Sequence, residues 1–499
     1  MRKAGILMSI SSLPSKYGIG CFSQEAYTFV DDLKNAGMSI WQLLPLGPTS
    51  YGDSPYQSFS TFAGNPYFID PETLVKKGYI TKGRCDAYDF GKDIQAVDYE
   101  KIYKSRFKLL KEAFKKFDVG DKKFLKFRKD NAYWLGDYAL YMAVKNSFKN
   151  KSWQEWDDDI RLRKKEALEK YRNKYSGEVL FYEFLQFEFS EEWRELKKYA
   201  NSKGISIVGD IPIYVALDSA DTWANPDLFQ FDEDLRPEAV AGCPPDAFSS
   251  DGQLWGNPLY DWDVHKKTGY KWWIRRLKSC FELYDWVRID HFRGFDEYYS
   301  IPFPSENAKN GKWKKGPGFD LFKVMKEKLG DRPVIAEDLG YLTPSVIKLV
   351  KRTGYPGMKI LQFAFDSREE SDYLPHNYGS NSVVYTGTHD NDTTQHWFEV
   401  LNPKDRKFAS EYMNISKDEK LSEIPWIFIR GAFASVSAIA VIPMQDVLSL
   451  GGKARMNMPS TLGGNWQWRM KPGAFTLSRQ MRLKKMAKLY GRLPKDNKS

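Results

Sequence analysis

The chain has 499 residues, 42% of them hydrophobic and 28% charged, and a formal net charge of +10. These values are typical of a soluble globular protein, and no run of about 18 apolar residues occurs, so we expect neither a membrane span nor a membrane partner. We attribute the positive charge to the solvated faces of amphipathic helices, as in residues 101–129, and do not expect nucleic-acid binding.

The first predicted element starts almost at the N-terminus, as a short apolar run. This run is too short for a secretory signal peptide, so we expect a cytoplasmic protein. Seven similar runs follow, most of them before a loop and a plausible helix such as Ala26–Ala36. The eight predicted strands are Ile6–Ile10, Ile40–Leu44, Ile205–Val208, Trp286–Ile289, Val334–Ala336, Met358–Phe363, Val383–Tyr385 and Ala438–Ile442. Their alternation with helices predicts an α/β fold, a (β/α)8 TIM barrel; an open doubly wound sheet remains the alternative.

We expect one catalytic barrel domain over residues 1–499, with two insertions. Residues 65–200 separate the second and third strands and contain helical patterns, including Tyr99–Phe117 and Glu183–Ala200. Because no linker-like sequence flanks them, we predict a helical insertion and not an independent domain. Residues 215–270, between the third and fourth strands, are rich in Pro, Gly, Asp and Trp and predict a loop-rich insertion. We expect no C-terminal β-sandwich, because few residues follow the eighth predicted strand.

The cysteine and histidine patterns suggest no metal or cofactor. The four cysteines are widely spaced and include no C-x-x-C pair, so they predict neither a zinc site nor a disulfide framework; they are Cys21, Cys85, Cys243 and Cys280. The five histidines form no H-E-x-x-H arrangement. We therefore expect no metal site and no cofactor.

Three of the predicted strands each lead into a carboxylate, namely Asp290, Glu337 and Asp390. Acids at the C-terminal ends of barrel strands lie where such barrels keep their catalytic residues. Two carboxylates that face each other across a sugar are the working pair of a retaining glycosidase. One strand-end acid alone is more often a helix cap or an ion-pair partner, but three on one rim favour catalysis.

The residues around these acids suggest different roles for them. Arg288 precedes Asp290 by two positions, and a nearby guanidinium favours the ionised form that a nucleophile requires. Glu337 follows an apolar run, where desolvation raises the pKa toward that of a general acid. Asp390, beside His389, is placed to bind sugar hydroxyls and to favour a distorted ring.

Four more residues are candidates for substrate contacts. Asp210 ends the third predicted strand and is a fourth acid on the same rim, although a structural hydrogen bond to a loop explains it equally well. Tyr51, Tyr56 and Trp255 lie in polar loops, where an aromatic ring can pack on the face of a sugar. For each aromatic alone, packing within the protein is slightly favoured over ligand contact.

A set of short motifs, in order along nearly the whole chain, resembles the 4-α-glucanotransferases, also called amylomaltases or disproportionating enzymes (glycoside hydrolase family 77). The motifs are Ser11–Pro14, Gly47–Gln57, Gly209–Val215, Pro244–Asp246, Gln253–Pro258, Arg288–Phe295, Ala336–Gly340, Gly387–Thr393, Gln445–Leu448 and Ala454–Asn457.

The resemblance implies a (β/α)8 barrel with inserted subdomains that transfers part of an α-1,4-glucan to the 4-hydroxyl of glucose or another glucan, with retention. It implies Asp290 as nucleophile, Glu337 as general acid/base and Asp390 as transition-state stabiliser. Residues around the bound glucan would be Arg288, His389, Asp210, Tyr56 and Trp255, and Tyr51 would belong to a second glucan-binding surface.

Two positions depart from the family pattern. Cys243 replaces an aliphatic residue and Ala247 replaces an aromatic one in a loop that borders the acceptor side. We expect these two changes to leave cleavage of the glucan unaffected, but they make the preferred product size and the sensitivity to thiol reagents uncertain. An α-glucan hydrolase of the α-amylase kind, or a non-catalytic glucan-binding protein, would share many of these features and remain as alternatives.

Overall fold

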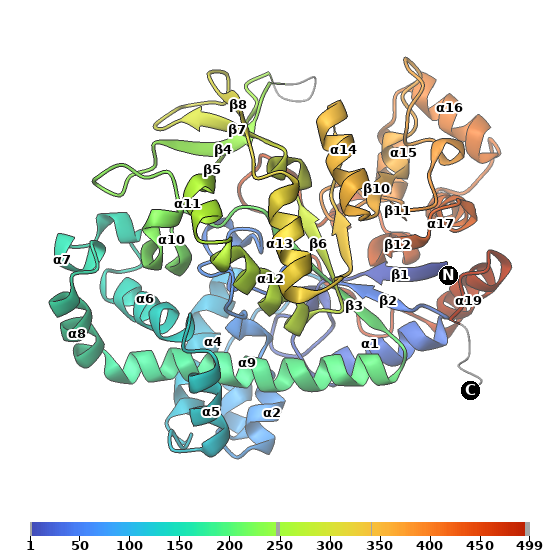
Figure 1. The fold of residues 1–499 in the computed structure, drawn as a ribbon. Helices are drawn as coiled ribbons and strands as arrows, with labels where there is room; N and C mark the ends of the chain where they lie inside the picture. The colour runs from blue at the N-terminus through green and yellow to red at the C-terminus, as the bar shows by residue number, and fades with distance from the viewer. Residues whose placement is uncertain (1, 246–249, 341, 495–499) are drawn as a thin grey trace.

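Eight parallel strands form the centre of the computed structural model, which describes residues 2–245, 250–340 and 342–494 (Figure 1). Hydrogen bonding connects them in the order β10-β11-β12-β1-β2-β3-β6-β9. Their bounds are β1 Lys3–Leu7, β2 Ile40–Gln42, β3 Ser206–Pro212, β6 Trp286–Asp290, β9 Val334–Ala336, β10 Gly357–Ile360, β11 Ser382–Tyr385 and β12 Ile439–Pro443. Most strand residues are buried, as expected for parallel strands covered on both faces.

The sheet curves round until its two ends meet. The backbone N–H of Ala336 in β9 donates to the carbonyl of Pro356, just before β10, at 3.0 Å. The N–H of Met358 in β10 donates to the Asp338 carboxylate at 2.7 Å. The eight strands thus form a nearly closed barrel, which confirms the predicted (β/α)8 fold and excludes the open doubly wound sheet.

The strand bounds agree with those predicted to within four residues, and those of β9 agree at both ends. The first predicted strand, Ile6–Ile10, is shifted to Lys3–Leu7, because Ile10–Ser12 forms a 3-10 turn. The strand predicted at Met358–Phe363 similarly ends at Ile360. In both places the apolar run continues into a buried turn, so the hydrophobic pattern does not mark the end of the strand.

Helices cover the outside of the barrel (Figure 1). Those that follow or flank the barrel strands are α1 Gln24–Asn35, α12 Lys271–Leu283, α13 Phe319–Leu329, α14 Pro344–Thr353, α15 Thr394–Val400, α16 Pro403–Met413, α17 Ile424–Ala434, α18 Met444–Val447 and α19 Leu477–Leu489. Helix α14 shows how the sequence defines such an element. The Thr343 side chain accepts from the N–H of Val346, Pro344 occupies the first turn, and Gly354 ends the helix in the left-handed region.

The segment between β2 and β3 is mainly helical and ends in a long helix, α9 Ser176–Ser202, which runs along one side of the molecule (Figure 1). The shorter helices before it are α2 Pro71–Lys76, α3 Lys82–Asp86, α4 Tyr99–Phe114, α5 Lys122–Asp130, α6 Leu135–Ser147, α7 Asp158–Arg161 and α8 Lys165–Lys174. A buried aromatic cluster joins α9 to these helices; Phe184, for example, lies 4.7 Å from Phe117, measured between ring centroids.

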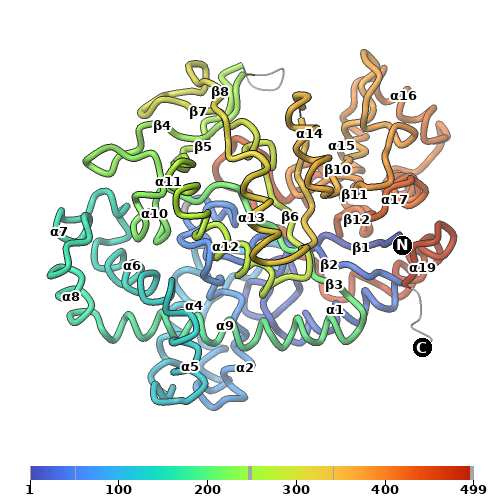
Figure 2. The backbone as a smooth tube through the Cα atoms, in the orientation of Figure 1, coloured from blue at the N-terminus to red at the C-terminus, as the bar shows by residue number. Residues whose placement is uncertain are grey.

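A second, four-stranded antiparallel sheet lies beside the barrel, toward the top in Figure 2. Its order is β5-β4-β7-β8, with bounds β4 Ala239–Cys243, β5 Gln253–Pro258, β7 Glu297–Pro302 and β8 Lys312–Lys315; short helices α10 Ala220–Ala224 and α11 Trp262–Lys267 flank β4 and β5. The sequence analysis did not predict this sheet. Its strands are short and come from two separate parts of the chain, and the register shifts between Val240 and Gly242, so no regular alternation identifies it.

Arg492 joins the end of the chain to the N-terminal side of the barrel. Its guanidinium is fully buried and donates to the carbonyls of Phe433 at 2.8 Å, Lys3 at 3.0 Å and Ser437 at 2.9 Å. Phe433 lies in the last turn of α17, Lys3 begins β1 and Ser437 precedes β12. One side chain thereby holds three separate segments together. Among the described residues, no helix has both the length and the apolar character needed to cross a membrane.

We expect Arg492→Leu to lower the free energy of unfolding by about 2–4 kcal/mol, because it leaves several buried carbonyls without their charged donor. Chemical denaturation measures this change. Arg368→Leu is the control, because Arg368 is an exposed arginine paired with Asp366, and its replacement should leave the unfolding midpoint nearly unchanged. Equal midpoints for the two variants would contradict the role given to Arg492.

Candidate active site

The site is built around a buried guanidinium on β6. Arg288 Nη1 donates to both carboxylate oxygens of Asp210, at 2.7 Å each, and Arg288 Nη2 donates to Asp290 Oδ1, also at 2.7 Å. The register of the sheet explains the contact, because Asp210 on β3 lies directly opposite Arg288 on β6. Asp290 is the last residue of the same strand, so its carboxylate lies beside the cation and is only partly exposed.

Glu337 lies next to Asp290 at the same end of the barrel. In the β6–β9 ladder, Ile289 is opposite Ala336, so the two acids follow a registered pair on neighbouring strands. Neighbouring strands in a sheet are about 4.8 Å apart. The two carboxyl groups of retaining glycosidases are separated by a similar distance, about 5–5.5 Å. The sheet therefore places these two predicted site residues side by side.

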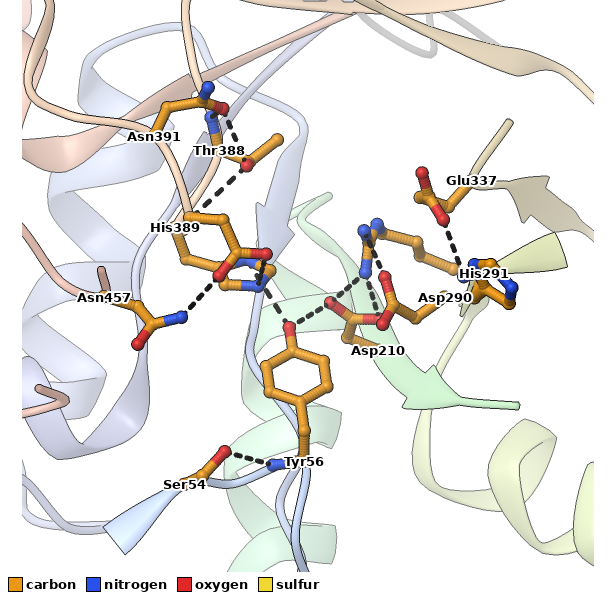
Figure 3. Close-up of polar contacts among 12 residues, drawn as sticks. Ser54, Tyr56, Asp210, Asp290, His291, Glu337, Thr388, His389, Asn391 and Asn457 are labelled. Atoms are coloured by element: carbon orange, nitrogen blue, oxygen red, sulfur yellow. Dashed lines mark hydrogen bonds and ion pairs between the residues drawn. The ribbon is translucent and has the colours of Figure 1, made fainter. Parts of the chain in front are cut away.

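Two backbone N–H groups orient the Glu337 carboxyl group. The N–H of His291 donates to Oε2 at 2.6 Å, and the N–H of Leu339 donates to Oε1 at 3.0 Å. His291 has the left-handed backbone conformation, with φ 55°, and this conformation lets the chain turn directly after Asp290 and present its N–H to Glu337. Figure 3 shows Glu337, His291 and Asp290 grouped on one side of the site.

Asp290 and Glu337 have different surroundings, and those of Glu337 shift its pKa strongly. Burial and the nearby Asp290 carboxylate raise the pKa of Glu337 to about 8, although Arg288 and the two N–H donors act in the opposite direction. Near neutral pH the Glu337 carboxyl group is therefore mostly protonated. A carboxyl group in this state can donate a proton.

Asp390 lies in the loop between β11 and α15, on the other side of the barrel mouth. Asn457 Nδ2 donates to Asp390 Oδ1 at 2.7 Å, and His389 Nε2 lies 3.3 Å from Asp390 Oδ2. Burial raises the pKa of Asp390, but the charge and hydrogen bond of His389 outweigh it and hold the pKa well below the usual range. Burial lowers the pKa of His389, whereas the charge and hydrogen bond of Asp390 raise it. The net effect is a raised pKa for His389. Asp390 is thus kept ionised.

Tyr56 connects the two halves of the site. Its hydroxyl donates to Asp210 Oδ2 at 2.7 Å and lies 3.4 Å from His389 Nδ1, and its ring stacks on His389 with centroids 5.0 Å apart. Figure 3 shows Tyr56 between Asp210 on one side and His389 on the other. A continuous series of polar contacts therefore runs from the nucleophile candidate Asp290 to Asp390.

Trp255 on β5 brings the second sheet to the site. Its ring meets His291 edge to face, with centroids 4.8 Å apart, and its Nε1 donates to Gln253 at 3.0 Å. Cys243 ends β4 beside it, whereas Ala247 lies outside the described residues. Tyr51 begins the 3-10 turn Tyr51–Asp53, but its side chain is outside the described part of the structure. The structure thus brings every predicted site residue except Tyr51 into one region.

Three further residues act in the site without having been assigned a role from the sequence. Arg455 donates to the carbonyl of Asp390 at 2.9 Å, and Asn457 binds its carboxylate. His291 is half-buried, desolvation lowers its pKa to about 4, and its backbone N–H donates to Glu337. The family motifs contain all three, but nothing in their spacing showed which acid each would contact. Within the described residues, no cluster of three His, Cys, Asp or Glu side chains is arranged to hold a metal ion.

The chain is similar to known proteins along nearly its whole length. Residues 8–476 match the family model described as 4-alpha-glucanotransferase. A 4-alpha-glucanotransferase of Clostridium butyricum is 51% identical over 97% of this chain and 100% of that protein, and one of Streptococcus pneumoniae is 51% identical over 99% and 98%. The crystal structure of an amylomaltase from Streptococcus agalactiae in complex with acarbose matches with TM-score 0.96 and 45% identity, over 99% of this chain and 100% of that one.

We expect Asp290→Asn to lower the pKa of Glu337, because the substitution removes a neighbouring negative charge that disfavours ionisation. Titration of 13C-labelled glutamate side chains by NMR measures the change. Asp331→Asn, at an exposed acid paired with Lys326, is the charge-matched control and should leave the Glu337 titration in place. An unchanged pKa in Asp290→Asn would show that the two carboxyl groups are not coupled.

Proposed function

The chain belongs to the 4-alpha-glucanotransferases of glycoside hydrolase family 77 and disproportionates α-glucans, and we propose that Asp290, Glu337 and Asp390 carry out a retaining, two-step transfer. The observation that carries the proposal is the pair of acids at the ends of neighbouring strands in different surroundings. Asp290 is held beside the Arg288 guanidinium, and Glu337 keeps its proton near neutral pH. A nucleophile and a general acid require such different surroundings.

In the first step, Asp290 attacks the anomeric carbon of an α-1,4-glucan. The glycosidic bond breaks as Glu337 gives its proton to the departing 4-hydroxyl oxygen, and the donor segment becomes an ester of Asp290. Asp390 is ionised and held by Asn457 and His389, so it can stabilise the positive charge of the oxocarbenium-like transition state.

In the second step, the 4-hydroxyl of glucose or another glucan takes the place of the departed chain. Glu337, now a carboxylate, removes the proton of this hydroxyl, and the new bond displaces Asp290. Both displacements invert the anomeric carbon, so the product is again an α-1,4-glucan. Both reactants and products are therefore α-1,4-glucans, and no cofactor is needed.

Transfer in place of hydrolysis requires an acceptor sugar to occupy the site before water attacks. Trp255 is suited to this task, because it places an aromatic ring against His291 next to Glu337 and such rings pack on sugar faces. We propose that Trp255, Tyr56, Arg288, His389 and Asp210 line the bound glucan and that Tyr51 belongs to a second glucan-binding surface. We also propose a cytoplasmic location, since Cys21, Cys85 and Cys280 are buried thiols.

We expect the protein to convert maltotriose into glucose and longer maltooligosaccharides, which chromatography resolves. Asp290→Asn should abolish this conversion, and Glu337→Gln should slow it by about 10²- to 10⁴-fold. Maltotriose turnover by Asp290→Asn at near the wild-type rate would refute the mechanism. Glucose and maltose as the main products would identify a hydrolase, and undiminished maltotriose turnover by Glu337→Gln would show that Glu337 is not the general acid/base.

The pH profile tests the role of Glu337 independently. Because the first step needs the protonated carboxyl group, kcat/KM for maltotriose should fall about tenfold per pH unit above a pKa of about 8. Fluoride departs without protonation, so an α-maltosyl fluoride donor should not show this alkaline limb in kcat/KM. The same limb with both donors would assign it to another group.

A further inference from the structure

A buried carboxylate behind the loop that carries His389 and Asp390 has no part in the steps above. Asp446 belongs to α18, directly after β12, and is 1% exposed. Its Oδ2 accepts from the hydroxyls of Thr386 at 2.5 Å and Thr394 at 2.6 Å, and its Oδ1 accepts from the N–H of Thr394 at 2.8 Å. Among the described residues it makes no ion pair.

The positions of these two threonines give the contact its importance. Thr386 is the first residue after β11, and Thr394 is the first residue of α15. They are the two ends of the loop, 386–394, that holds His389 and Asp390, and both are fully buried. One carboxylate therefore connects the start of the loop to its end.

The chemistry of the three donors suits a carboxylate. Two hydroxyls and one N–H converge on the same side chain, and an ionised carboxylate accepts all three without a donor of its own. An uncharged apolar side chain at this position would leave these groups unpaired in the interior. Burial raises the pKa of Asp446, and the hydrogen bonds from Thr386 and Thr394 act in the opposite direction.

Gln362 also contacts both ends of the loop, over longer distances than Asp446 does. Its backbone N–H donates to the carbonyl of Thr386 at 3.2 Å, and its Nε2 donates to the Thr394 hydroxyl at 3.3 Å and to the carbonyl of Asp392 at 2.9 Å. Within the loop, Asn391 accepts from the N–H of Thr388 at 2.8 Å. A cavity of about 20 Å³ lies between the loop and the barrel, roughly the room of one water molecule. The loop is thus tightly packed, and its position depends on the groups at its ends.

We propose that Asp446 is a positioning residue for glucan transfer: by joining Thr386 to Thr394 it fixes the loop that sets Asp390 against His389 and the sugar. The proposal rests on the function proposed for Asp390. A positioning role differs from a general contribution to stability. If Asp446 positions the loop, its substitution should lower activity through its effect on Asp390. A displacement of about 1 Å in a catalytic group can cost about 100-fold in rate.

The test uses Asp446→Ala, Thr386→Val and the full-length protein, with fluoride release from α-maltosyl fluoride as a sensitive assay. Thr386→Val keeps the shape of the side chain and removes one donor, so it remains informative if Asp446→Ala does not fold. The assay is run at temperatures well below unfolding. We expect kcat to fall by about 100-fold in Asp446→Ala and by less in Thr386→Val, and we expect KM to change little in both. Glu192→Gln is the matched control, since Glu192 is a buried carboxylate that accepts the N–H of Asp70 at 2.8 Å, remote from the site; it should keep its kcat.

Double mutants decide between positioning and stability. If Asp446 acts through Asp390, adding Asp446→Ala or Thr386→Val to Asp390→Asn should cost little further activity. The pKa of His389, measured by NMR in Thr386→Val, should also move toward the usual range as the contact with Asp390 loosens. Fully multiplicative losses, or an unchanged kcat in the single variants, would overturn the proposal. Unimpaired Asp390→Asn would instead refute the function proposed for Asp390.

Discussion

The site depends on a guanidinium buried between two carboxylates. Arg288 is almost fully buried and binds Asp210 on one side and Asp290 on the other. Removing either acid would leave a poorly compensated charge in the interior, which is costly. The pairing also fixes β3 against β6 at the end where they present their functional groups. The position of Asp290, the proposed nucleophile, is thus inseparable from the packing of the barrel.

The same end of the barrel gives two similar acids opposite states. Glu337 is half-buried next to Asp290, and desolvation and the Asp290 carboxylate raise its pKa to about 8. Asp390 is also only partly buried but lies against His389 and Asn457, which favour its ionised form. Burial alone does not determine the state of either group; the sign of the neighbouring charge does. A retaining transfer needs one proton donor and one fixed negative charge, and the two environments supply them.

The chain between the barrel strands adds specificity to this chemistry. Trp255 comes from the second sheet, Tyr56 from the loop after β2, and Asn457 from the segment after β12. Each reaches the acids through a direct contact or through one intervening residue. The barrel therefore supplies the rigid carboxylates, and the longer connections supply the surfaces that a sugar chain would contact.

Much of the architecture could be predicted from the sequence, because parallel strands buried on both faces appear as short apolar runs. Asp290 and Glu337 follow such runs directly, and Asp390 follows one after four residues. The alternation of strand and helix indicated a barrel, and the family motifs indicated which acid has which role. Only the tertiary structure decided the rest. The Arg288–Asp210 pairing, the approach of Asn457 to Asp390 and the closure of the loop by Asp446 join residues 60 to 80 positions apart, and no local pattern encodes which partners meet. The antiparallel sheet went unpredicted for the same reason, since its stability comes from pairing between distant strands and not from their individual sequences.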